Sequence, residues 1–219
     1  MTKTDKLNKL FDKWVKEIPE YAGKFIKDGI ISESLYNEAR KKILFIMKEP
    51  DDPEQTEWTF QDLWEDGVRH RFSFRLADWA YGIFHDFPDY NKVTSIKENR
   101  DNAIKSIALI NIKKTGGTNS SDKEEIFNHC ERNHKFILKE IEIIDPEIII
   151  LGTGSWKIRE SMFKNVEWEE LKEFKHDILL GKWGQTLIVD FIHPSARFKS
   201  VYMYDLLRHV FSSKEFQYL

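Results

Sequence analysis

The chain has 219 residues, of which 41% are hydrophobic and 14% are aromatic, enough to form a well-buried core. Its mean hydropathy of -0.54 and the absence of an apolar run of about 18 residues argue against a membrane span, and its Lys-rich start is unlike a signal peptide, so we predict a cytoplasmic protein. Cys130 is the only cysteine, which excludes an internal disulfide and a four-cysteine zinc or iron–sulfur site built from this chain alone. The formal net charge of -3 is not typical of a non-specific nucleic-acid binder.

The N-terminal segment has the pattern of helices. Apolar residues recur at helical spacing over residues 3–18, where Pro19 follows, and residues 20–42 predict one or two short helices. No linker, repeat or low-complexity segment divides the chain. We therefore predict a single domain over residues 1–219, with residues 1–42 as an N-terminal helical elaboration.

Four short apolar runs after this segment predict buried strands. The runs cover residues 43–47, 106–112, 147–151 and 187–192, and a short edge strand is expected at residues 178–180. Helices are predicted over residues 74–84, 94–105, 122–144, 155–164 and 200–212, and an irregular excursion over residues 51–75. Strands that alternate with helices predict a three-layer α/β/α fold with a central, mainly parallel four-stranded sheet.

Polar side chains stand where these strands end. Glu49 follows the first strand, Asn111 ends the second, and His193 follows the fourth. Because the carboxyl ends of parallel strands share one edge, we expect these side chains to face a flat, polar ligand. A carboxylate can orient water, an imidazole can stabilise an oxygen that gains negative charge, and an amide can pair with a base edge.

Glu49 and Asn111 also have a purely structural interpretation. Glu49 beside Lys48 suits a solvated loop, and Asn111 suits a turn in which it bonds neighbouring backbone. Residues 152–155 lack the ending of a phosphate-binding loop and favour a strand-to-helix turn. The fixed charges from residue 49 to residue 66 are all acidic, whereas basic residues lie in or beside later predicted turns and would form a local phosphate-binding patch if those turns share one rim.

Four landmarks follow one another in a characteristic order. They are Glu49-Pro50 after a strand, Ala108–Asn111 before a basic loop, residues 146–152 ahead of a helix, and His193-Pro194-Ser195 after the last strand. From residue 43 to residue 208 this order resembles the uracil-DNA glycosylase superfamily. The resemblance implies that family's fold and a protein that extrudes a uracil-like base from DNA and hydrolyses its N-glycosidic bond without a metal or cofactor.

The resemblance also implies roles for individual residues. Glu49 and His193 would be catalytic, the first favouring an oxocarbenium-like sugar and positioning water, the second stabilising the departing base, and Asn111 would bind the base edge. The remaining expected contacts are a stacking ring from Phe72 or Phe74, phosphate contacts from Lys113, Ser155, Ser195 and Arg197, and a wedge from Phe198.

Two alternatives remain. Met47 and Asp51 depart from the family pattern, which has glycine at the first position and tyrosine or glycine at the second, so an inactive module that binds a nucleobase, a nucleotide or nucleic acid in the same pocket is the second hypothesis. The third is a metal-dependent phosphoesterase that uses Asp51 and Asp52. The sequence leaves the preferred base and the oligomeric state open.

Overall fold

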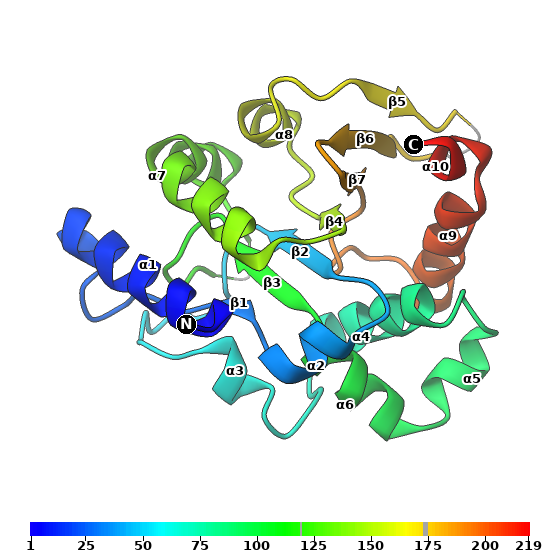
Figure 1. The fold of residues 1–219 in the computed structure, drawn as a ribbon, viewed down its shortest axis with the longest axis horizontal. Coiled ribbons are helices and arrows are strands. Elements are labelled where there is room, and N and C mark those ends of the chain that lie inside the picture. The colour runs from blue at the N-terminus through cyan, green and yellow to red at the C-terminus, as the bar shows by residue number, and fades with distance from the viewer. Residues whose placement is uncertain (119, 173–174) are drawn as a thin grey trace.

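A computed structural model describes residues 1–118, 120–172 and 175–219. Its strands form one mixed sheet in the order β1-β3-β2-β4-β7-β6-β5 (Figure 1). The strands are β1 (Gly29–Ile30), β2 (Ile43–Met47), β3 (Ala108–Asn111), β4 (Ile148–Leu151), β5 (Trp168–Glu170), β6 (Leu179–Trp183) and β7 (Thr186–Asp190).

The middle of the sheet consists of the four strands that the apolar runs predict. β3, β2, β4 and β7 are neighbours and run parallel. The sheet is nevertheless wider than predicted, because β1 adds to β3, and β6 and β5 add beyond β7, all antiparallel. β1 has two residues and β5 includes Glu169 and Glu170, so neither has an apolar run. The short strand predicted at the edge of the sheet corresponds to β6, which is not an edge strand because β5 lies beyond it.

The helices between the strands agree with most of the predicted ranges. They are α1 (Lys3–Glu17), the 3₁₀ turn η1 (Pro19–Tyr21), α2 (Glu33–Glu38), α3 (Phe60–Leu63), α4 (Arg71–Phe84), α5 (Tyr90–Thr94), α6 (Lys97–Lys105), α7 (Lys123–Ile144), α8 (Trp156–Met162), α9 (Ser200–Ser212) and α10 (Lys214–Tyr218). α4 begins three residues earlier than predicted. The reason is local, since the Ser73 hydroxyl accepts from the His70 N–H at 3.1 Å and closes the first turn.

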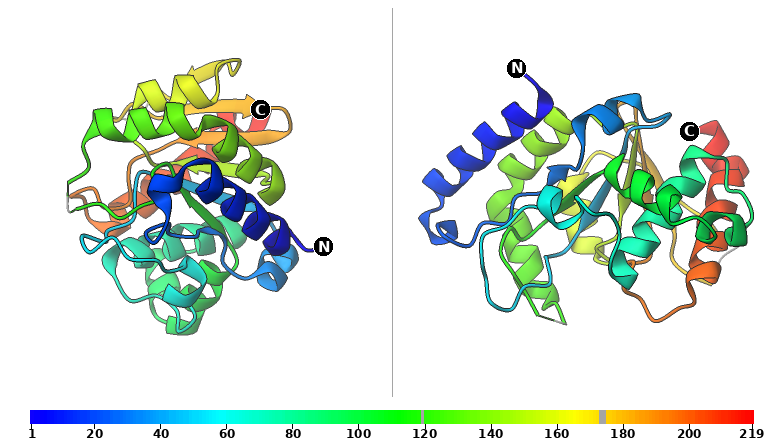
Figure 2. Two further views of the ribbon diagram at one scale, coloured as in Figure 1. Left: turned by 90° about the vertical axis from the view of Figure 1, so that its left-hand side faces the viewer. Right: turned by 90° about the horizontal axis from the view of Figure 1, so that it is seen from below.

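Helices cover both faces of the sheet (Figures 1 and 2). The two faces follow from the alternation of side chains along β2: Phe45 packs with α4, α6 and α9, whereas Leu44 packs with α1, α7 and α8. Within the described ranges, every helix is too short or too polar to span a lipid bilayer.

The N-terminal segment is built into this architecture. Trp14 of α1 is fully buried, and its ring stacks on Phe136 of α7 at 4.8 Å between ring centroids. Its indole N–H also donates to Asn133 of α7 at 3.2 Å. Residues 1–42 therefore contribute a helix to one covering layer and β1 to the sheet.

Candidate functional site

The carboxyl ends of the four parallel strands lie at one edge of the sheet. Met47 is in register with Asn111, and the ladder continues past both, since the Lys113 N–H donates to the Lys48 carbonyl at 2.9 Å. Gly152, after β4, lies where an added Cβ would be 2.9 Å from the Met47 sulfur. The segments that follow these strands therefore begin side by side.

Glu49 is held in a buried ion pair at this edge. Its Oε2 lies 2.9 Å from Nζ of Lys113, and their side chains are only 5% and 8% exposed. Lys113 also contacts Glu125 at 2.8 Å. Burial opposes the charge on Lys113, but its hydrogen bonds to Glu125 and Glu49 outweigh burial and raise the pKa of its ammonium group. Gly117 allows this arrangement, because a Cβ there would lie 2.1 Å from Oε2 of Glu49.

His193 has a neutral imidazole ring with a defined tautomer. Burial, and then the positive charge of Lys48, lower the pKa of His193 to about 3. Its Nδ1 accepts from the Ser195 N–H at 3.1 Å, so the ring proton is on Nε2. The Phe72 ring lies 6.1 Å from the imidazole, between centroids. His193 can therefore donate a hydrogen bond from Nε2 without carrying a charge.

Asn111 is almost fully covered, at 2% exposure, and faces the N-terminal segment. The Asp28 carboxylate accepts from its backbone N–H at 2.7 Å and from its side-chain amide at 3.4 Å. The second contact is weak for a hydrogen bond. In the structure as described, Asn111, Glu49 and His193 share the sheet edge without direct contact with one another.

Of the two phenylalanines predicted to stack on a base, one lies at this edge. Phe72 contacts His193, whereas Phe74 lies under the guanidinium of Arg100, 5.0 Å from its ring centroid. The two residues are two positions apart on α4 and so lie on different sides of the helix.

The residues expected to contact phosphate have different surroundings. Ser195, Arg197 and Phe198 are exposed in the loop between β7 and α9. Ser155 precedes α8 and makes no side-chain capping bond. Lys113 is buried as the counterion of Glu49, an environment that the sequence did not predict for it.

Two further polar residues at this edge were missed. Burial, and then the nearby charge of Lys123, lower the pKa of Lys48, which has no ion-pair partner among the described residues. Thr153 is 3% exposed, and its hydroxyl is without a hydrogen-bond partner in the described part of the chain. Lys48 could have been found from its position between a buried strand and Glu49. Thr153 lies in residues 152–155, where the sequence favours only a strand-to-helix turn.

Asp51 and Asp52 are not grouped with a third potential metal ligand among the described residues. Asp52 stabilises a turn, where its Oδ2 accepts from the Thr56 N–H at 2.8 Å and from the Trp58 indole at 3.2 Å. Among residues 1–118, 120–172 and 175–219, no three His, Cys, Asp or Glu side chains are grouped to hold a metal ion.

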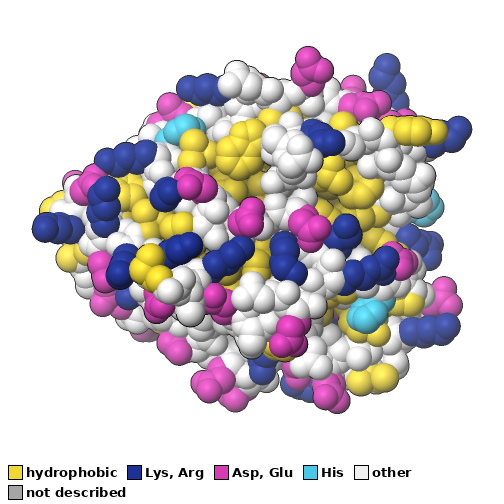
Figure 3. Space-filling view, in the orientation of Figure 1, with side chains coloured by type: hydrophobic (Ala, Val, Ile, Leu, Met, Phe, Trp, Pro, Cys, Tyr) yellow, Lys and Arg dark blue, Asp and Glu magenta, His cyan; other side chains and the backbone are white. Residues whose placement is uncertain are grey.

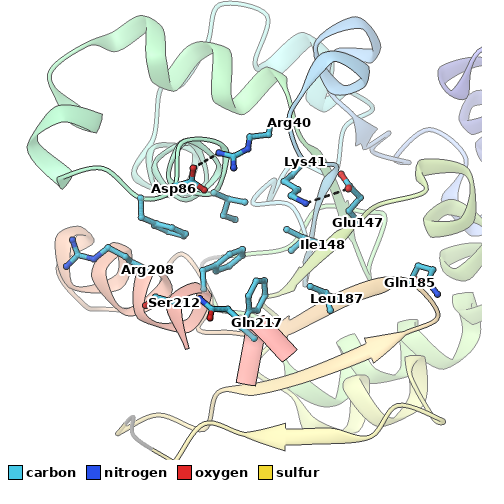
Figure 4. A pocket seen from close by; sticks show the side chains of 14 residues that line it. Arg40, Lys41, Asp86, Glu147, Ile148, Gln185, Leu187, Arg208, Ser212 and Gln217 are labelled. Carbon is cyan, nitrogen blue, oxygen red and sulfur yellow. Dashed lines mark hydrogen bonds and ion pairs between the residues drawn. The ribbon is translucent and has the colours of Figure 1, made fainter. Parts of the chain in front are cut away.

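A pocket of about 640 Å³ lies at the opposite edge of the sheet, beside the first residues of β4 and β7 (Figure 4). On this face, hydrophobic side chains gather in a hollow bordered by charged ones (Figure 3). The charges at its rim pair with each other, as Lys41 does with Glu147 at 3.9 Å. This pocket contains none of the residues predicted to be functional.

The sequence was also compared with known proteins. It matches no protein-family profile and no curated protein.

Proposed function

We propose that the protein is a DNA glycosylase of the uracil-DNA glycosylase type, which hydrolyses the N-glycosidic bond of uracil or a related base in DNA. The observation that carries the proposal is the neutral His193, whose Nε2–H is available at the same sheet edge as the ion-paired carboxylate of Glu49. The parallel order β3-β2-β4-β7 supports the same fold assignment.

The two groups suit the two charges that develop when this bond breaks. The sugar becomes cationic, which a fixed carboxylate stabilises, and the base leaves as an anion, which a neutral N–H donor stabilises. A neutral imidazole suits the second task because it donates a hydrogen bond without giving up a proton to water at ordinary pH.

The spacing of the strands suits a base as ligand. Asn111 belongs to β3 and His193 follows β7. Because β2 and β4 lie between these two strands, β3 and β7 are roughly 14 Å apart, at about 4.8 Å from each strand to the next. A planar base bound between Asn111 and His193 would draw the Asn111 amide away from the Asp28 carboxylate. Since Glu49 and Asn111 are both nearly covered, a base can reach them only after the side chains that cover them move.

The second candidate is a binding module without catalytic activity. The Lys113–Glu49 ion pair favours it, because a carboxylate that is already paired is a poorer base for water than a free one. In that case the same edge would bind a nucleobase and leave the glycosidic bond intact.

An abasic-site assay tests the proposal. Single- and double-stranded oligonucleotides that contain uracil or hypoxanthine are incubated with the protein in buffer that contains a chelator. Alkali then cleaves the strands at any abasic sites. We expect abasic product, and a loss of about 10²–10³-fold in its rate for His193→Ala and for Glu49→Gln, because each removes one source of charge stabilisation.

Two matched variants serve as controls. His209→Ala removes an exposed histidine of α9, and Glu54→Gln removes an exposed acid from the loop after β2, so both should retain the wild-type rate. Binding of the oligonucleotide with no abasic product would favour the binding module. The absence of both would refute the assignment of this edge to nucleobases.

A further inference from the structure

Three aromatic side chains form an exposed cluster next to the candidate site, here called the aromatic platform: His176, Phe198 and Tyr202. The rings of Phe198 and Tyr202 are 5.7 Å apart between centroids, and His176 lies 5.1 Å from Phe198. A hydrogen bond of 2.9 Å joins the His176 imidazole to the Tyr202 hydroxyl. Phe198 and Tyr202 remain 39% and 42% exposed. Apolar rings that are fixed in place and left this open can accept another flat ring.

The platform has a rigid support. Arg75 of α4 is 1% exposed, and its guanidinium donates to the carbonyls of Ala196, at 2.7 Å, and of Phe198. It also donates to the Ser200 hydroxyl at 3.1 Å. The backbone that carries Phe198 is therefore ordered before any ligand arrives, which lowers the entropy lost on binding.

Three cations without ion-pair partners in the described structure adjoin the backbone of Phe198. Arg71 donates to the Phe198 carbonyl at 3.3 Å, and Arg197 and Lys199 flank Phe198 in the chain. In the described structure none of these three has an ion-pair partner, unlike the neighbouring pair Arg208 and Asp205 at 3.1 Å. Positive charge without a protein partner is complementary to a phosphodiester backbone.

The platform and the candidate site are adjacent. Phe72, in the first turn of α4, contacts His193, and Arg71, in the same turn, contacts the Phe198 backbone. A chain of nucleotides that crosses the platform would therefore bring a neighbouring nucleotide to His193.

The geometry points to single-stranded DNA as the partner of this surface, with an unpaired base stacked on Phe198 and Tyr202 and its phosphates on Arg71, Arg197 and Lys199. Aromatic rings with nearby cations are typical of sites that bind single strands without reading their sequence. Duplex DNA fits less well, because its base faces are already covered by one another. That the next nucleotide enters the site at His193 rests on the function proposed above.

Equilibrium binding tests the inference independently of catalysis. The probe is a fluorescein-labelled oligothymidylate of about 12 nucleotides, which contains no uracil, and its anisotropy is measured with the full chain. We expect Phe198→Ala and Tyr202→Ala each to weaken binding by about tenfold, and Tyr202→Phe to retain most of it. Arg197→Ala should lower the slope of log affinity against log salt concentration by about one.

Trp156→Ala is the matched control, because it removes another exposed aromatic ring, 65% exposed, from α8. It should bind as the wild type does. Equal binding by wild type, Phe198→Ala and Tyr202→Ala would overturn the inference, as would tighter binding of a duplex of the same length or no binding at all. If oligothymidylate binding fails while abasic product still forms, the inference about the platform is wrong and the glycosylase proposal stands. If oligothymidylate binds through the platform but no abasic product forms, the platform stands and the glycosylase proposal fails.

Discussion

His193 keeps a neutral imidazole at a pH where a solvated histidine would take up a proton. Burial is the main cause, and the positive charge of Lys48 adds to it, so the pKa falls to about 3. The Ser195 N–H then fixes which ring nitrogen carries the proton. At the scale of this one residue, backbone geometry and burial together select a hydrogen-bond donor over a cation.

This protonation state makes stability depend on pH. In the unfolded chain His193 takes up a proton near pH 6.5, whereas in the folded chain it does so only near its pKa of about 3. Its contribution is therefore present above pH 6.5 and lost as the pH falls toward 3. We expect the urea midpoint to fall from about pH 7 to about pH 5, and to fall less in His193→Gln. His209→Gln, which changes an exposed histidine, should follow the wild type. An equal fall of the urea midpoint with pH in the wild type and both variants would contradict the lowered pKa of His193.

At the scale of elements, the segments after β2 and β3 pack against each other through glycines. The Gly117 N–H donates to the Pro50 carbonyl at 2.9 Å. A Cβ at Gly116 would lie 1.9 Å from the Asp52 carbonyl oxygen, and one at Gly117 would meet the Glu49 carboxylate. The ion pair between Glu49 and Lys113 thus depends on two residues that have no side chain of their own.

Alanine substitutions separate steric clash from backbone strain. Gly116→Ala should destabilise the protein by about 2–3 kcal/mol in urea unfolding, because a backbone carbonyl blocks the new methyl group. Gly117→Ala should displace Glu49 and lower activity or base binding. Gly154→Ala has open space but a φ of +60°, so it should cost only about 1 kcal/mol. A Gly116→Ala protein as stable as Gly154→Ala would show that these segments do not pack as described.

At the scale of the whole molecule, a buried charge cluster ties three parts of the chain together. Lys114, after β3, lies 2.6 Å from Asp28 of the N-terminal segment and 2.8 Å from Glu140 of α7, and all three side chains have no exposed area. Its ammonium group also lies 5.2 Å from the Trp14 ring. Two carboxylates share one cation, and burial, the largest cause, raises the pKa of Glu140 well above its usual value. The loop that holds Glu49 is anchored to the helical layer through this cluster.

Glu140→Gln tests the raised pKa of Glu140. Because the folded pKa of Glu140 is raised, the stability it contributes is present below the unfolded pKa of about 4.5 and is lost as the pH rises through the folded value. Glutamine does not ionise, so it makes no such pH-dependent contribution. We expect the difference in unfolding free energy between variant and wild type to shift in favour of Glu140→Gln from about pH 5 to about pH 8. Glu142→Gln, an exposed change on the same helix, should show no such trend, and a constant difference for Glu140→Gln would contradict the raised pKa of Glu140.

The local elements could be predicted because their signals lie within short stretches of sequence. The apolar run from Ile43 to Met47 forms a strand buried on both faces, and the helix predicted at residues 200–212 is α9 with the same bounds. Asp145 adopts a left-handed conformation, with φ of 54°, at the end of α7 directly before Pro146, where the sequence predicts the stop. The alternation of such strands and helices also predicted the parallel centre of the sheet.

The sequence by itself thus determined the α/β class, the four parallel strands and the sheet edge at which Glu49, Asn111 and His193 stand. Only the tertiary structure decided their surroundings. Charges find partners by distance in space, so Glu49 pairs with Lys113, 64 positions away, and not with its neighbour Lys48. Burial, which no local pattern encodes, sets the neutral state of His193 and covers Lys114, while pairing to an existing strand produced β1 and β5 from stretches too short or too charged to predict.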